Sequence, residues 1–185
     1  AEATSRAAWD YYEKYDQDEF KDVKVLAVHV HGPGNIYTAK KQIKTMADIK
    51  GLKLRGPTRL TTKLLASMET DRSANALYTS VFVVPMNKAK YDSLPADLKK
   101  VIDKNSGREL SAFLGKTQAG ADGPGKEKLI AGGHTITVIP KAELENWKKA
   151  SDSLDDEWVA DMNKRGAEGQ KLLNEARALI KQYTK

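Results

Sequence analysis

Two stretches of the chain are almost continuously apolar and β-branched, which is the pattern of strands buried on both faces. Residues 23–30 (VKVLAVHV) form the first stretch, and residues 77–85 (LYTSVFVVP) form the second. Alternation of apolar and polar residues predicts two shorter strands, at 52–55 and at 134–139. A further short strand is expected at 35–40, after a Gly-Pro-Gly turn.

Helical spacing of apolar residues predicts helices between and after these strands. The expected helices cover 6–15, 58–68, a short segment within 86–94, a long helix from 95 that ends at Asp122–Gly125, a short helix at 126–131, and stretches at 140–154, 155–163 and 168–182. Gly107, Gly115 and Gly120 weaken the long helix, so a bend or break is expected within it. Strands that alternate with helices make this an α/β protein.

The composition is that of a soluble globular protein, with 40% hydrophobic and 30% charged residues among 185. No apolar run approaches the roughly 20 residues of a membrane-spanning helix, so we expect a chain that is not embedded in a membrane. Cysteine is absent, which excludes disulfides, thiolate nucleophiles and cysteine-ligated zinc.

The net charge of +6, from 31 basic and 25 acidic residues, raises the question of nucleic-acid binding. The basic residues are interleaved with acidic ones, as on solvated helix faces, and no basic stripe carries aromatic residues. We therefore expect no nucleic-acid partner. A basic interaction module for acidic partners stays open as a third reading.

Residues 48–59 (DIKGLKLRGPTR) combine a strand end, a Gly-Pro bend and a helix start, with Thr58 in the position of an N-cap. Arg55 then lies at the carboxyl end of a strand, where ligands bind in open α/β sheets. A guanidinium beside helix N–H groups suits a carboxylate or a phosphate. The alternative is a solvated surface arginine. Arg59 follows on the first helical turn, as a second positive charge or a solvated one.

His29 and His31 are two residues apart, so both face one side of their strand. With a third ligand they could hold a metal, which leaves a metal-dependent or enzymatic protein as the alternative function. The simpler interpretation is a polar pair that lines a pocket. No H-E-x-x-H, G-x-S-x-G, P-loop or G-x-G-x-x-G pattern is present. We therefore expect no catalytic residues, no metal and no cofactor.

Several segments in the same order resemble the solute-binding proteins of tripartite ATP-independent periplasmic (TRAP) transporters. They are 43–55 (IKTMADIKGLKLR) before Gly-Pro-Thr and a helix, 82–102 (FVVPMNKAKYDSLPADLKKVI), 133–138 (GHTITV), and Trp158 near a terminal helix. The resemblance covers nearly the whole chain. It implies a two-lobed receptor of the periplasmic-binding-protein type, with a long bridging helix, that closes on an organic acid and delivers it to a membrane permease.

The resemblance also assigns roles to individual residues. It implies that Arg55 pairs with the carboxylate of the ligand. It also implies that the protein acts in the periplasm. The loop that carries His29 and His31 is expected to line the cleft, and Tyr78 is a further candidate for it. An aromatic or hydrophobic acid is favoured over a sugar acid, because this loop has two histidines and few amides.

The family normally has a longer N-terminal region and a strand–helix–strand passage where this chain has only residues 69–76. We therefore expect an incomplete fold, with a break or deletion near 68–69; the rival interpretation is a compact variant with a true deletion. The expected parts are 1–22 (helix and connection), 23–86 (α/β lobe segments), 87–140 (bridging helix and lobe strand) and 141–185 (helices packing across the lobes).

Overall fold

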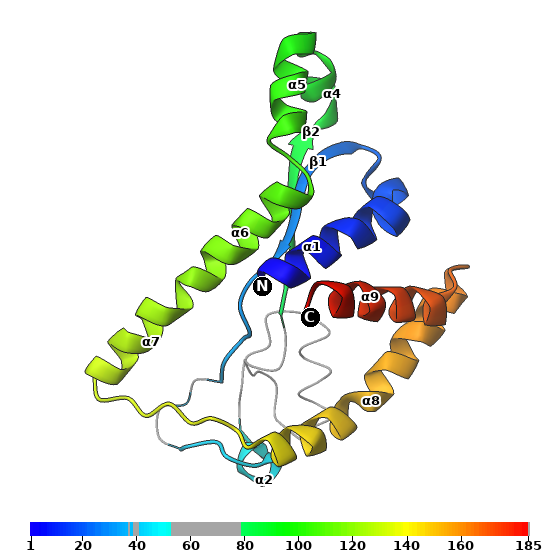
Figure 1. Cartoon of the computed structure of the whole chain (residues 1–185). Coiled ribbons are helices and arrows are strands. Elements are labelled where there is room, and N and C mark those ends of the chain that lie inside the picture. The colour runs from blue at the N-terminus through cyan, green and yellow to red at the C-terminus, as the bar shows by residue number, and fades with distance from the viewer. Residues whose placement is uncertain (37, 39–40, 53–78, 185) are drawn as a thin grey trace. The chain divides into compact units, whose positions relative to one another are not determined.

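The computed structural model describes residues 1–36, 38, 41–52 and 79–184. Its elements are α1 (Glu2–Tyr11), the π-helical turn η1 (Tyr12–Asp16), the 3-10 turn η2 (Gln17–Phe20), β1 (Val23–Val30), α2 (Met46–Ile49), β2 (Val81–Asn87), α4 (Lys88–Asp92), α5 (Ala96–Lys104), α6 (Arg108–Gly120), α7 (Asp122–Ala131), α8 (Lys141–Lys164) and α9 (Gly169–Tyr183) (Figure 1). They mix helix with strand, as expected.

The chain divides into two compact units. The first comprises Ala1–Gly32, Thr79–Gly125 and Lys171–Lys185, and the second comprises Pro33–Tyr78 and Lys126–Gln170. Each unit has its own buried core.

The first unit is built on an antiparallel ribbon of β1 and β2. The register pairs Val23 with Asn87 and His29 with Phe82, and it is interrupted by an irregularity between Val25 and Ala27. The predicted strand at 23–30 is confirmed with the same bounds. The second predicted strand is confirmed as β2, which begins at Val81 and runs to Asn87 rather than ending at 85.

The edge of β1 that faces away from β2 is closed by groups from two helices. The main-chain N–H of Val30 donates to Ser5 Oγ of α1, at 3.0 Å, and the N–H of Val28 donates to Ser111 Oγ of α6, also at 3.0 Å. Between α5 and α6, the N–H of Gly107 donates to the carbonyl of Leu26, at 2.7 Å. Both serines are fully buried, so these bonds satisfy strand groups that water cannot reach.

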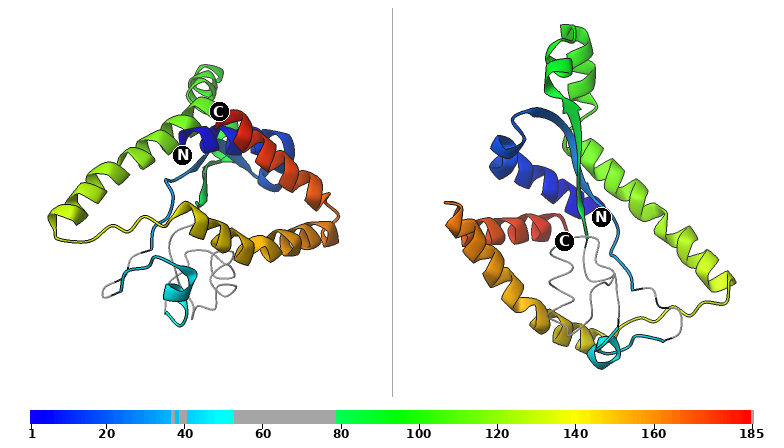
Figure 2. Two further views of the ribbon diagram at one scale, coloured as in Figure 1. Left: turned by 60° about the horizontal axis from the view of Figure 1, so that its bottom comes forward. Right: turned by 180° about the vertical axis from the view of Figure 1, so that it is seen from behind.

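Two glycines allow α6 to come this close to the strand and to α1. A Cβ at Gly115 would lie 2.2 Å from Ser5 Oγ and 3.0 Å from the carbonyl oxygen of Ala1, so no larger residue fits there. Gly107 has φ of 87°, a conformation that glycine adopts without strain, and its carbonyl accepts from Ser111 Oγ at 2.8 Å. The views in Figure 2 show α1 running beside β1 in this unit.

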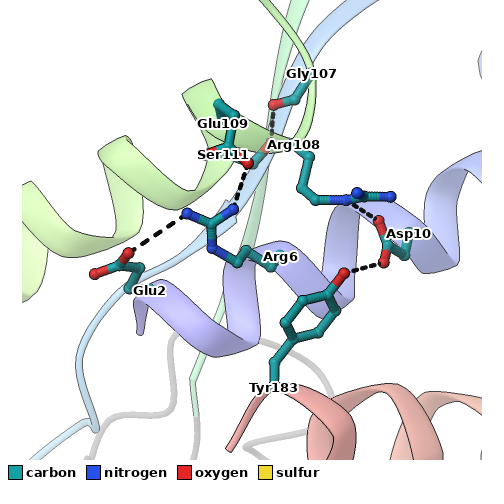
Figure 3. Close-up of polar contacts among 8 residues, drawn as sticks. All are labelled: Glu2, Arg6, Asp10, Gly107, Arg108, Glu109, Ser111 and Tyr183. Atoms are coloured by element: carbon teal, nitrogen blue, oxygen red, sulfur yellow. Dashed lines mark hydrogen bonds and ion pairs between the residues drawn. The ribbon is translucent and has the colours of Figure 1, made fainter.

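Charged and phenolic groups join α1, α6 and α9 at the surface of the same unit (Figure 3). Asp10 accepts from Arg108 Nε at 2.5 Å and from the hydroxyl of Tyr183 at 2.6 Å. Arg6 pairs with Glu109 of α6 and lies 3.6 Å from Glu2. The bond to Glu109 raises the pKa of Arg6, although partial burial opposes it. Asp10 therefore joins α9 to α1 and α6.

The core of the second unit forms around Trp147 of α8. This side chain is buried together with Ile43 and Ile49. The carboxylate of Glu143, one turn earlier, accepts from the main-chain N–H of Met46 at 2.6 Å and from Trp147 Nε1 at 3.0 Å. It therefore joins α8 to α2. The bond from Met46, with those from Asn146 and Trp147, lowers the pKa of Glu143.

Three local predictions are wrong. Residues 134–139 form no strand, and neither do the described residues of 35–40. Both segments have the apolar pattern, but no neighbouring strand in the described part of the chain pairs with them, and Val138 is 81% exposed. Asp122–Gly125 opens α7 instead of ending a helix, because a proline is tolerated in the first turn.

The predicted long helix from 95 is divided at Gly107 into α5 and α6, in agreement with the expected break. The predicted helices at 140–154 and 155–163 are one helix, α8, of 24 residues. Residues Met46–Ile49, just before the predicted strand at 52–55, form the short helix α2. The predicted strand at 52–55 beyond Leu52, the helix at 58–68 and the junction at 68–69 lie outside the described residues.

Replacing Ser111 with alanine is expected to lower the free energy of unfolding by about 1–3 kcal/mol, because the N–H of Val28 is then buried without an acceptor. Chemical denaturation followed by far-UV circular dichroism measures this loss. Ser153→Ala, at an exposed position of α8, is the control and is expected to change little. Equal effects of the two variants would contradict the role of Ser111.

Glu143 is expected to make the second unit sensitive to acid. Its pKa is below the ordinary 4.5 in the native state, so its contribution is present above about pH 4.5 and is lost as the pH falls through the lowered value. Trp147 fluorescence during acid titration reports this transition. Glu143→Gln should destabilise the unit at neutral pH and remove part of the acid transition. Glu145→Gln, two residues further along α8, is the control and should leave the transition in place.

Candidate ligand-binding site

Among the described residues, three aromatic rings of the first unit gather where β1 ends and β2 begins. His29 and Phe82 are cross-strand neighbours, and their rings stack with centroids 5.2 Å apart and an interplanar angle of 20°. His31 lies on the same face, with its ring 5.8 Å from that of Phe82 and tilted by 53°. The prediction that both histidines face one side of the strand is therefore confirmed, and Phe82 joins them.

His31 fastens the end of β1 to the start of β2. Its Nε2 accepts from the main-chain N–H of Ser80 at 3.1 Å, and its carbonyl accepts from Thr79 Oγ1 at 2.9 Å. Nδ1 pairs with the carbonyl of Gly32. Since Nε2 accepts, this network assigns the proton to Nδ1, which donates to Gly32. Both ring nitrogens therefore bond to the main chain, and His31 holds the geometry of the strand ends.

His29 has a different environment. Its Nδ1 is buried and makes no hydrogen bond within the protein. A buried polar atom without a partner costs roughly 1–3 kcal/mol relative to a satisfied one. An apolar ring at this position would keep the stack on Phe82 without that cost, so stability alone does not account for a histidine here.

A hollow of about 420 Å³ lies elsewhere in the first unit. It is lined by Trp9, Glu13, Lys24, Val25, Asp103, Ser106, Gly107 and Arg108. Lys24 is 2.7 Å from Asp103, and Tyr91 donates to both oxygens of that carboxylate at 2.8 Å. The bond to Lys24, with that from Tyr91, lowers the pKa of Asp103. These charges are paired with each other, so the hollow offers a ligand less than the aromatic cluster does.

The remaining site predictions fall outside the described residues. Arg55, Arg59 and Tyr78 all lie within 53–78. Of the five candidates, the structure therefore brings together His29 and His31. The sequence analysis missed Phe82 and Ser80, because their roles depend on the cross-strand register. The run of residues 81–85 is continuously apolar, so it predicts a strand but does not show which face Phe82 takes.

A metal site built on the two histidines has little support. His31 uses both ring nitrogens for main-chain bonds. Across residues 1–36, 38, 41–52 and 79–184, no group of three or more His, Asp or Glu side chains is arranged to hold a metal ion. Nor does any helix in this part of the chain have the length and apolar character to span a membrane.

The fold and sequence match one class of protein, the bacterial extracellular solute-binding proteins. The model of family 7 of that class (DctP) matches residues 72–161. Comparison with curated protein sequences gives no match. A TRAP solute-binding protein from Rhodoferax ferrireducens T118, in complex with copurified benzoate, is 40% identical with a TM-score of 0.96. The similarity covers 100% of this chain and 71% of that one.

A second solved structure is a marine metagenome TRAP solute-binding protein, from an unidentified microbe, described as specific for aromatic acid ligands and co-crystallised with 3-hydroxybenzoate. It is 33% identical with a TM-score of 0.94, over 100% of this chain and 71% of that one. A third, from Bordetella bronchiseptica with bound mandelate, is 23% identical with a TM-score of 0.86, over 98% and 71% of the chains, and shows the fold alone.

The chain belongs to the family of TRAP solute-binding proteins. This confirms the resemblance and the expected two-lobed α/β fold, and it makes the protein a transport receptor rather than an enzyme. The metal-dependent or enzymatic alternative is not favoured. About three tenths of each of these relatives has no counterpart here, in agreement with the expectation that segments of the family fold are absent.

The two histidines are expected to respond differently to replacement by phenylalanine. His29→Phe keeps a ring on Phe82 and removes a buried unpaired nitrogen, so the free energy of unfolding should stay equal or rise by about 1 kcal/mol. His31→Phe removes the acceptor of the Ser80 N–H and should lower it by about 1 kcal/mol. Paired thermal unfolding measurements compare them, and an equal loss in both variants would contradict this assignment.

Proposed function

We propose that the protein is a periplasmic receptor for an organic acid, which it delivers to a TRAP-type membrane permease. The observation that carries this proposal is the 40% identity, over the whole chain, to a TRAP solute-binding protein that holds benzoate. A second relative above 30% identity holds 3-hydroxybenzoate. Both ligands are aromatic carboxylates, which supports an aromatic acid for this chain as well.

Arg55 is the proposed anchor for the carboxylate. A guanidinium forms two parallel charge-assisted hydrogen bonds to a carboxylate, which fixes its orientation as well as its position. Arg55 follows the alternating segment 52–54 and precedes Gly-Pro-Thr, the sequence context of a strand end beside a helix start. Arg59 supplies a second positive charge, and Tyr78 contributes to the wall of the site.

The aromatic cluster of His29, His31 and Phe82 supports the preference for an aromatic acid. An arginine alone recognises any small carboxylate, including sugar acids. Phe82, His29 and His31 instead present ring surface with few free hydrogen-bonding groups, and both nitrogens of His31 bond to the main chain. Such a wall accepts an apolar ring more readily than a chain of hydroxyls, because each hydroxyl would lose its water without gaining a partner.

Arg55→Ala is expected to weaken binding of benzoate by on the order of 10- to 100-fold, since a charge-assisted pair is lost. Isothermal titration calorimetry with benzoate, 3-hydroxybenzoate, mandelate and galactonate measures both affinity and preference. Arg59→Ala is the matched control, with the same change of charge four residues away, and is expected to have the smaller effect. Unchanged affinity in Arg55→Ala would show that the carboxylate binds elsewhere.

A further inference from the structure

Phe82 is an aromatic side chain that contacts two rings and is still partly exposed. It is 41% exposed, although it is paired with His29 across the ribbon and contacts two other rings. A large apolar side chain on a strand normally contributes to stability by burial, and this one leaves much of that contribution unused. Its exposed surface is thus ready to take up another apolar group.

The ring of Phe82 stacks on the ring of His29, which orients it. The two rings are nearly parallel, with an interplanar angle of 20°. His29 holds this position even though its Nδ1 is buried without a partner. The pair therefore forms a flat, preorganised surface at a cost in stability. Costs of this kind are typical of positions that serve binding.

We propose that Phe82 is the platform on which the ring of an aromatic acid stacks, with His29 as the residue that positions it. This inference rests on the proposed receptor function and assigns the part of the site that selects the ligand ring. Stacked aromatic pairs are more favourable than burial of the same area alone, because the ring quadrupoles interact in offset geometry. The platform therefore distinguishes an aromatic ring from a saturated ring of the same size.

Benzoate and cyclohexanecarboxylate provide the direct test, since they share the carboxylate and differ in the ring. Calorimetry on the 185-residue chain should show a preference for benzoate. Phe82→Leu should weaken benzoate binding by roughly three- to tenfold and leave cyclohexanecarboxylate nearly unchanged, so the preference is lost. Phe113→Leu, at a 61% exposed phenylalanine of α6, is the matched control and should keep the wild-type preference.

Two variants of His29 separate positioning from stability. His29→Ala removes the stack and should lower the preference for benzoate, whereas His29→Phe restores a ring and should recover it. A residue with a merely structural role would change unfolding without changing this ratio. Phe82→Met, which keeps the side-chain volume without a ring, is the second variant at position 82 and should also lose the preference.

The outcomes are distinguishable from failure of the receptor function itself. An unchanged benzoate preference in folded Phe82→Leu and Phe82→Met overturns the platform and leaves the receptor proposal standing. Wild-type protein that binds no acid of the panel overturns the receptor proposal, and the platform with it. Loss of preference at Phe82 with retained preference at Phe113 supports both.

Discussion

The first unit depends on how the outer edge of β1 finds its hydrogen bonds. A two-stranded ribbon is marginal by itself, and its unpaired main-chain groups cannot be buried without partners. Ser5, Ser111 and Gly107 provide those partners from α1, α6 and the turn between α5 and α6. Because both serines must reach the same edge, α1 and α6 lie close together, and Gly115 leaves the space for Ser5 between them. Strand and helices are therefore stable only together.

The sequence predicted the elements whose pattern is local, and it failed where a distant partner decides. The run 23–30 was identified with its observed bounds, because uninterrupted β-branched residues have few other solutions. The segment 134–139 has a regular alternation of apolar and polar residues, which also predicts a strand, but it is not a strand in the structure. Alternation shows which face of a strand would be buried, but a strand also needs a neighbour, and one sequence does not name it.

The candidate site shows the same limit at the level of single residues. The spacing of His29 and His31 was sufficient to place them on one face, which is a local property. The different contacts of the two histidines could not be predicted from the sequence, because they depend on Ser80 and Phe82 across the ribbon. Both ring nitrogens of His31 bond to the main chain, whereas His29 stacks on Phe82 and has a buried nitrogen without a hydrogen bond. Arg55 was predicted as a site residue from its flanking sequence motif and from the resemblance of the chain to TRAP solute-binding proteins.

The closed edge of β1 also has a consequence for how this sheet can grow. Ser5 and Ser111 occupy the hydrogen-bonding positions that an incoming strand would need on that side. An additional strand, whether from an exchanged segment of another molecule or from an aggregating peptide, therefore cannot bond to the N–H groups of Val28 and Val30. The two serines thus protect this edge of β1, the strand that carries His29, from non-native strand pairing.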